Sequence, residues 1–205
     1  MMEKAFEIGI SELKEFIVYH YLNSPRVDKY RRIRPLLLWS ESSVEKTLIY
    51  SVVKQLAKAL KKEVILLNDH NIDIVERNPE NYFVLHVFKL SSVTPEDFIG
   101  YLKDKGEYVE RELPRTWYVL SNPKVHGILF LDEITDIKNN TVRRSTYQIL
   151  YDHMIEWMPL SPNVLVVCAG SKRPLPASLV SRLSIIFLKK TPPSEFTSRL
   201  PRNKK

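Results

Sequence analysis

The sequence predicts an α/β fold, a three-layer α/β/α sandwich around a mostly parallel sheet. Short apolar runs (35–39, 63–68, 82–88, 127–133, 163–170 and 183–188) alternate along the chain with segments of helical periodicity. The runs are apolar on both faces, which is typical of strands in a parallel sheet covered on both sides. With 205 residues the chain has room for one such domain. We expect an N-terminal helical segment (1–30), an α/β core (31–190) and a basic tail (191–205).

The first half of the core follows from local patterns. Apolar side chains at helical spacing predict helices over 10–23 and 44–61, on either side of the strand 35–39. Branched and aromatic residues predict strands over 63–68 and 82–88, and the polar stretch between them is interpreted as a connection with a turn at Asn78-Pro79. Thr94 followed by Pro95 predicts the N-terminus of a further helix.

The second half ends in alternating strands and helices. Residues 107–120 alternate loosely and predict an arm or hairpin. Strands are expected at 127–133, 163–170 and 183–188, and an amphipathic helix at 141–157. The single cysteine, Cys168, lies in one of these strands and is interpreted as a small buried hydrophobic residue. The five histidines never recur at metal-ligand spacing, so the sequence predicts no zinc site.

Composition indicates an intracellular, cytoplasmic protein with no membrane partner. The apolar runs are far shorter than the roughly 20 residues that span a bilayer, and the N-terminus lacks the pattern of a secretory signal. The net charge is +7, with basic residues gathered at Arg26–Arg34 and in the C-terminal tail. Such clusters are either a solvated surface or a contact to nucleic acid, so a nucleic-acid partner remains open.

The strand "GILFLDE" ends in Asp132 and Glu133. Ligands of parallel sheets bind at the carboxyl edge of the strands, where these two carboxylates would lie. In a phosphate-loop NTPase the aspartate organises Mg²⁺ and the glutamate orients the attacking water. A strand followed by a polar turn would give the same pattern, so the motif alone is weak.

The segment "SESSVEKT" has the spacing of a phosphate-binding loop but no glycine. The loop requires two glycines before Lys-Ser/Thr, and serine and glutamate occupy those two places here. Lys46 would reach the β- and γ-phosphates, and Thr47 would hold Mg²⁺. The candidate nucleotide-binding residues are Ser40, Glu41, Ser42, Ser43, Val44, Glu45, Lys46 and Thr47.

From about residue 33 to 196 the chain resembles the AAA+ P-loop ATPase core, in its MoxR-like branch. The resemblance is carried by "LLLWSESSVEKTLIYSVVKQLAKAL", "FKLSSVTPEDFIGYL", "HGILFLDEITDI", "STYQILYDHMIEWMPLSPNVLVVCAGSKRP" and "LPASLVSRL", in the order of that family. They are similar to its phosphate loop, the segment that follows its second core strand, its Walker B strand, its sensor 1 strand and its arginine-finger segment.

The resemblance implies roles for individual residues. Thr47 and Asp132 would be metal ligands for Mg²⁺, and Glu133 would be the catalytic acid that positions water. Ser171 occupies the sensor 1 position, where asparagine is usual, and Arg182 aligns with the arginine finger that completes a neighbour's site. ATP and Mg²⁺ are the implied cofactors, and a homo- or hetero-oligomeric ring is the implied assembly.

Three departures from the family weaken this expectation. Ser40, Ser43 and Glu45 stand where glycines let backbone N–H groups close on the phosphates, and Glu45 adds a carboxylate beside a polyanion. The stretch after the last strand is too short for the family's helical lid. Two strand-like runs, 63–68 and 82–88, stand where one is expected.

Two functional hypotheses follow. The chain is either an AAA+ ATPase core with weakened nucleotide binding, or a catalytically inactive AAA+-like subunit that serves as a structural or regulatory interaction module.

Overall fold

A computed structural model describes residues 7–24, 33–40, 46–171 and 175–188. Within these ranges seven strands form one sheet in the order β1-β11-β2-β10-β7-β4-β3, and every pair in it is parallel. The strands are β1 (Glu7–Ile8), β2 (Leu36–Trp39), β3 (Glu63–Leu66), β4 (Tyr82–Lys89), β7 (His126–Asp132), β10 (Val164–Gly170) and β11 (Ser184–Leu188).

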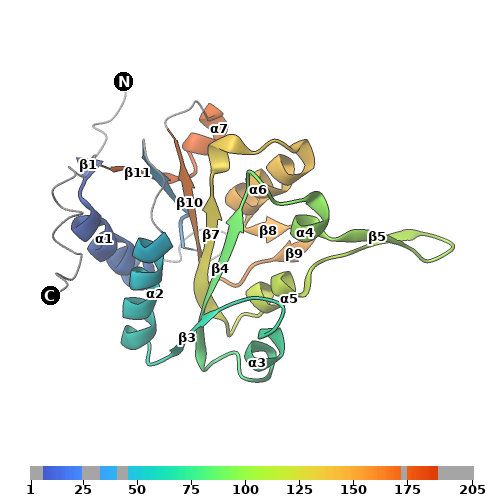
Figure 1. Ribbon diagram of the computed structural model, residues 1–205, viewed down its shortest axis with the longest axis horizontal. Coiled ribbons are helices and arrows are strands. Elements are labelled where there is room, and N and C mark those ends of the chain that lie inside the picture. The colour runs from blue at the N-terminus through green and yellow to red at the C-terminus, as the bar shows by residue number, and fades with distance from the viewer. Residues whose placement is uncertain (1–6, 25–32, 41–45, 172–174, 189–205) are drawn as a thin grey trace, which may run out of the picture.

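Helices cover both faces of the sheet, as Figure 1 shows. On one face α1 (Ile10–Asn23) and α2 (Lys46–Ala59) pack against the sheet around Phe83, Phe130 and Val167. On the other face the core is built by α3 (Ile72–Arg77), α4 (Pro95–Ile99), α5 (Arg115–Ser121), α6 (Asn140–Asp152) and α7 (Ala177–Val180). The predicted three-layer α/β/α sandwich is confirmed.

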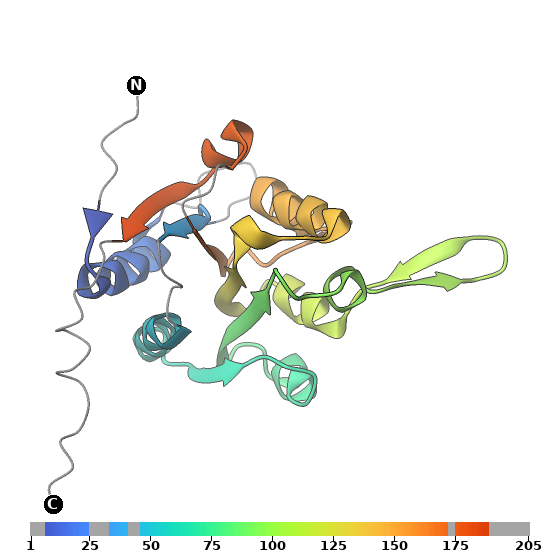
Figure 2. The ribbon, with the colours of Figure 1, turned by 45° about the horizontal axis from the view of Figure 1, so that its top comes forward.

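A two-stranded hairpin projects from this body. Its antiparallel strands β5 (Tyr101–Asp104) and β6 (Val109–Glu112) extend away from the sheet in Figure 2. Gly100 begins the hairpin at φ 74°, and a Cβ there would lie 1.8 Å from the carbonyl oxygen of Glu112. Glycine is therefore required where the chain leaves α4 for the arm. A smaller hairpin, β8 (Met154–Ile155) with β9 (Met158–Pro159), follows α6.

Several element predictions were wrong in detail. The stretch between β3 and β4 is not only a connection, because α3 forms there on the buried side chains Ile72 and Val75. The helix capped by Thr94 ends at Ile99, and residues 115–121 form α5 instead of part of an arm. The helix predicted to reach residue 157 ends at Asp152. The predicted strands at 63–68 and 82–88 both exist, and β3 is an edge strand.

Gly127 marks the closest approach within the sheet. It pairs with Val84 between β7 and β4, and a Cβ at Gly127 would lie 2.4 Å from the carbonyl oxygen of Val84. Both strands are buried, so neither backbone can move aside without disturbing the core on both faces.

We predict that Gly127→Ala lowers the free energy of unfolding by about 2–3 kcal/mol, because the added methyl overpacks two paired strands. Urea unfolding followed by circular dichroism measures the change. Gly9→Ala is the matched control: its Cβ would meet only Glu12 Oε2, at 3.6 Å, and its effect should stay below about 1 kcal/mol, because alanine is only a poorer N-cap than glycine at the start of α1. Equal stabilities of the two variants would contradict the prediction.

His86 is a buried polar side chain in β4, only 8% exposed. Its Nδ1 lies 3.0 Å from the carbonyl oxygen of Leu67. Burial lowers the pKa of His86 below its usual 6.5, more than this hydrogen bond and the charge of Asp69 raise it. The folded protein therefore favours neutral imidazole over imidazolium.

A depressed histidine pKa gives a definite pH dependence. The unfolded chain binds the proton near pH 6.5 while the folded chain does not, so stability is complete above that pH and is lost as the pH falls. We predict that wild type loses stability relative to His86→Phe between pH 7.5 and 5.5, by at most about 1.4 kcal/mol per pH unit. Urea unfolding at several pH values measures both proteins, and parallel curves would refute the assignment.

Candidate functional site

The candidate site lies at the carboxyl edge of the central strands. β10 lies between β2 and β7, with Gly170 opposite Trp39 and Cys168 opposite Leu131. Ser40 follows β2, and its N–H donates to the carbonyl oxygen of Gly170 at 3.1 Å. Because the strands are parallel and in register, the residues that follow them come to one edge. Ser40, Asp132 and Ser171 are thereby brought to the same side of the sheet.

Most of the predicted phosphate loop lies outside the described residues. This holds for Glu41, Ser42, Ser43, Val44 and Glu45. The helix α2 begins at Lys46, whose side chain is likewise not described, and Thr47 is exposed on its first turn. The position of α2 directly after the loop is as predicted, whereas the loop's contact with a phosphate stays a prediction.

Asp132 and Glu133 differ in their surroundings. Asp132 ends β7 and is 7% exposed, and its Oδ1 accepts the N–H of Glu133 at 2.9 Å. Glu133 has left-handed backbone angles, φ 57° and ψ 42°, and begins the 3₁₀ turn η1 (Ile134–Asp136). A non-glycine residue in this region is uncommon and is held there by its surroundings.

The side chain of Glu133 is held by the end of β4. Its Oε1 lies 3.2 Å from Lys89 Nζ, and its Oε2 accepts the hydroxyl hydrogen of Ser91. Lys89 and Glu133 are 52% and 33% exposed, so the ion pair adds little to stability. Its consequence is positional, because two contacts, from the last residue of β4 and from the turn after it, fix the direction of the carboxylate.

Ser171 is tied to the turn after β7. Its hydroxyl lies 3.1 Å from Thr135 Oγ1, and its N–H donates to the same oxygen at 3.2 Å. Thr135 also donates to Asp136 Oδ2 at 3.0 Å. Gly170 allows this approach, since a Cβ there would lie 2.9 Å from a methyl of Ile134. The predicted sensor position is therefore linked to the segment that follows Asp132 and Glu133.

Arg182 is placed apart from these residues. It follows α7, is exposed, and its guanidinium lies 5.1 Å from the ring centre of Tyr151 on α6. None of its contacts within the described ranges is to another predicted site residue. Arg34, the last residue of the predicted basic cluster, donates to the carbonyl oxygens of Ser181 and Leu183 on either side of Arg182.

Sequence reasoning missed three residues of this site: Lys89, Ser91 and Thr135. Lys89 and Ser91 come at the end of a predicted strand, and the rule that carboxyl ends share one edge could have brought them into view. Their contacts to Glu133 depend on β4 lying beside β7, and this strand order was not predicted from the sequence. Thr135 follows the acidic pair directly, but its bond to Ser171 depends on the neighbouring β10.

The donor set agrees in kind with a nucleotide and Mg²⁺. Thr47 offers a hydroxyl and Asp132 a carboxylate, and Mg²⁺ takes oxygen ligands from a few side chains together with substrate phosphates. Lys46 at the start of a 14-residue helix adds a cation to a helix N-terminus, which favours anions. Glu45 is the residue whose negative charge would repel a phosphate.

Comparisons with known proteins gave matches among solved structures only. No protein-family model and no curated protein matches the chain. A RuvB mutant from Thermotoga maritima is 17% identical over 87% of this chain and 45% of its own, with a TM-score of 0.44. NtrX from Brucella abortus is 15% identical over 89% and 37%, at 0.46, and PCH-2 from C. elegans is 15% identical over 87% and 41%, at 0.47.

The chain thus spans less than half of the length of each of these three proteins. At such identities and TM-scores the matches carry no argument about the site. Within the described residues, no helix combines the length and the apolar character that crossing a membrane requires.

We predict that Thr135→Val lowers the free energy of unfolding by about 1–2 kcal/mol, because the Ser171 N–H then loses its acceptor in a half-buried site. Thr135→Ser keeps the hydroxyl and serves as the matched control. Urea unfolding compares the two variants with wild type. An effect of the serine variant as large as that of the valine variant would place the cause in the methyl group instead.

Proposed function

We propose that this chain is an AAA+ type ATPase core, of the MoxR-like branch, that takes part in a remodelling assembly and binds Mg-ATP weakly. The loop after β2 would hold the triphosphate, with Lys46 against the β- and γ-phosphates. Thr47 and Asp132 would hold Mg²⁺, and Glu133 would orient water toward the γ-phosphate. The bound nucleotide would supply the phosphoryl group whose hydrolysis drives remodelling.

One observation carries this proposal. β7 delivers Asp132 and Glu133 to the edge where β2 delivers Ser40 and the loop that leads into α2. The hydrogen bond from Ser40 to Gly170 fixes the start of that loop beside β10, one strand away from the acidic pair. A helix start and two carboxylates at the same edge are the groups that a phosphate–magnesium complex needs.

Weak binding follows from the composition of the loop. Without glycine, positive φ angles cost roughly 1–2 kcal/mol per residue, and side chains hinder the approach of backbone N–H groups to phosphate. Glu45 adds the repulsion of a carboxylate from a polyanion, which is about 4 kcal/mol at 4 Å and an effective dielectric near 20. Since each 1.4 kcal/mol is a factor of ten, affinity is expected to fall by orders of magnitude.

The assembly would be a homo- or hetero-oligomeric ring, with Arg182 completing a neighbouring subunit's site. Its exposure, and the lack of any contact to another predicted site residue within the described ranges, support a role toward another chain. The contact with Tyr151 and the hydrogen bonds from Arg34 keep the Arg182 segment against α6 and the residues that precede β2. A charge held at the surface in this way is available to a partner subunit.

The second candidate is an inactive subunit that serves as an interaction module. It is favoured by the β5–β6 arm, whose exposed side chains include Tyr101, Leu102, Tyr108 and Val109. The basic residues that would contact nucleic acid are Arg26–Arg32 and the C-terminal tail, and they lie outside the described residues. Contact with nucleic acid therefore stays a separate proposal. Phosphate release by the assembled protein distinguishes the first candidate from the second, since only the first turns ATP over.

We predict that wild-type protein binds Mg-ATP with a dissociation constant above about 100 µM, in keeping with a loss of several kcal/mol. Replacing Ser40, Ser43 and Glu45 together by glycine should tighten binding at least about tenfold. Isothermal titration calorimetry measures both proteins. Adding Lys46→Ala to the triple variant should abolish the gain.

Two results would count against this proposal. Micromolar binding by wild type that Lys46→Ala removes would show an intact site and contradict weak binding. A folded triple-glycine variant that still binds no nucleotide would remove the assignment of residues 40–47 as a phosphate loop.

A further inference from the structure

A pocket of about 630 Å³ lies beside β4, on the sheet face that carries α3 and α5. Its volume is within the range of small-molecule sites. Its origin is a difference in strand length: pairing of β3 with β4 stops at Leu66 and Leu85, whereas pairing of β4 with β7 continues to Lys89 and Asp132. Leu67 still donates its N–H to the carbonyl oxygen of Leu85 at 2.8 Å, the residues after it lead into α3, and the base of the hairpin lines the opposite side.

The lining of this pocket is acidic in a basic protein. Four carboxylates line it, from Asp69, Glu96, Asp97 and Glu112, together with one guanidinium, from Arg115. Arg115 is already paired outside the lining, at 2.7 Å to Asp73 and 2.6 Å to Glu76. The lining therefore carries a net charge of −3 (four negative, one positive), against +7 for the whole chain.

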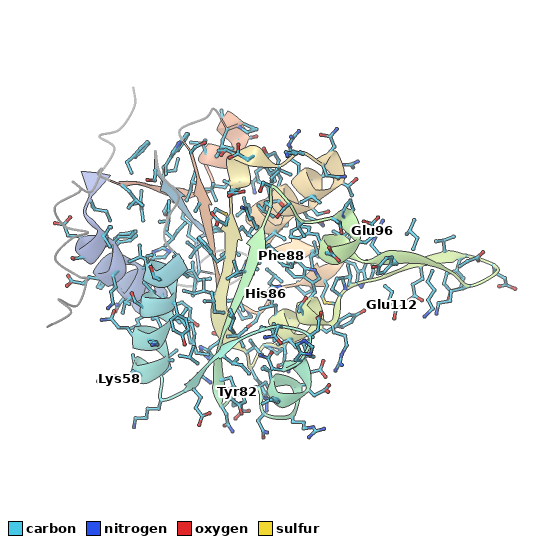
Figure 3. All side chains as sticks on the ribbon, viewed as in Figure 1. Lys58, Tyr82, His86, Phe88, Glu96 and Glu112 are labelled. Carbon is cyan, nitrogen blue, oxygen red and sulfur yellow. The ribbon has the colours of Figure 1, made fainter. Side chains whose placement is uncertain are left out.

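Two of these carboxylates have neither a hydrogen-bond partner nor an ion-pair partner within the described residues. Glu112 pairs with Lys103 at 3.0 Å, and Asp97 accepts the Thr94 hydroxyl at 2.8 Å. The side chains of Asp69 and Glu96 make no hydrogen bond or ion pair within the described part of the chain. Figure 3 shows Glu96 and Glu112 near the base of the hairpin, across from His86 and Phe88 on β4. Uncompensated charge on both sides of a pocket favours a cationic occupant.

His86 adds an independent observation, because it lines the pocket while more than nine-tenths of it is buried. A carbonyl oxygen only accepts hydrogen bonds, so Nδ1, bonded to Leu67, carries the proton. In the neutral ring Nε2 is then a lone-pair acceptor, and it has no partner within the described residues. A buried acceptor without a partner is costly and calls for a donor.

We propose that this pocket binds an organic cation, an ammonium or guanidinium group on an aliphatic stem. Its N–H group donates to His86 Nε2, its charge faces Asp69 and Glu96, and its stem lies along Phe88. Nε2 is itself covered, so this hydrogen bond requires the side chains around it to move aside. The cation is either a free polyamine or a lysine or arginine side chain of a partner protein, and neither depends on nucleotide binding at the other site.

A metal ion is a poorer match for this pocket. Within the described residues, no group of three or more histidine, cysteine, aspartate or glutamate side chains lies close enough to hold one. The carboxylates stand on different walls of a wide pocket, and such spacing suits a ligand several atoms long better than a single ion.

Calorimetry on the full chain at 150 mM salt tests the proposal, with two probes. One probe is spermidine, and the other is a capped glycine–lysine–glycine peptide. We expect at least one to bind, and Glu96→Gln and Asp69→Asn to weaken that binding about three- to tenfold each. Glu107→Gln is the matched control: it removes the same charge from the exposed hairpin outside the pocket, and it should leave binding unchanged.

His86→Phe removes the acceptor and keeps an aromatic ring, so this variant should also bind the cation more weakly. Circular dichroism reports whether the variant folds. If it does not fold, the two carboxylate variants decide whether the proposal holds. Binding of spermidine alone identifies a free polyamine, and binding of the peptide alone identifies a partner side chain. The proposal is overturned if neither probe binds. It is also overturned if Glu96→Gln and Glu107→Gln weaken binding equally, because equal weakening would reflect general electrostatic attraction.

Discussion

The parallel register of four adjacent strands is the constraint on which the candidate site depends. β2, β10, β7 and β4 run side by side and end at one edge, so residues separated by up to 130 positions meet there. Parallel pairing requires long crossovers, and the helices that form them cover both faces of the sheet. The same pairing needs Gly127, because β7 and β4 approach too closely for a side chain. A change at that contact, near the amino end of β7, would therefore disturb the core between the two strands.

The edge itself is organised by contacts between neighbouring strands. Glu133 is held by β4, Ser171 is held by the turn after β7, and Ser40 is bonded to the end of β10. Each of these links joins the end of one strand to the end of the next. A group that moved at one position would change the hydrogen bonds of its neighbours, so the edge is a single connected polar layer instead of a set of separate residues.

The segments of the fold that could be predicted from the sequence are those that are strongly buried. Strands such as Val164–Gly170 are apolar throughout and were predicted to within a residue or two, since burial on both faces leaves an unbroken apolar run. The helix α3 was missed because it is six residues long and buries only Ile72 and Val75, too few for a period to show. The exposed arm gave little periodicity because it has almost no buried face.

The same distinction explains the site. Asp132 was singled out because it lies at the end of a predicted strand, Ser40 from the spacing of the phosphate loop, and Ser171 from the family resemblance. Lys89, Ser91 and Thr135 act through neighbouring strands, and strand order is a non-local property that single-sequence patterns do not give. The pocket at His86 could not be predicted from the sequence, because it arises where β3 is shorter than its neighbour β4.

β4 connects the two regions of the molecule that carry polar chemistry. Side chains alternate along a strand, so His86 and Phe88 face the pocket side with Val84, whereas Lys89 belongs to the opposite set with Phe83 and Leu85. Lys89 lies three residues from His86 and contacts Glu133. Over this stretch β4 has lost its pairing with β3 and keeps only its ladder to β7. The two regions therefore share one strand, and the side chains that serve them occupy alternate positions along it.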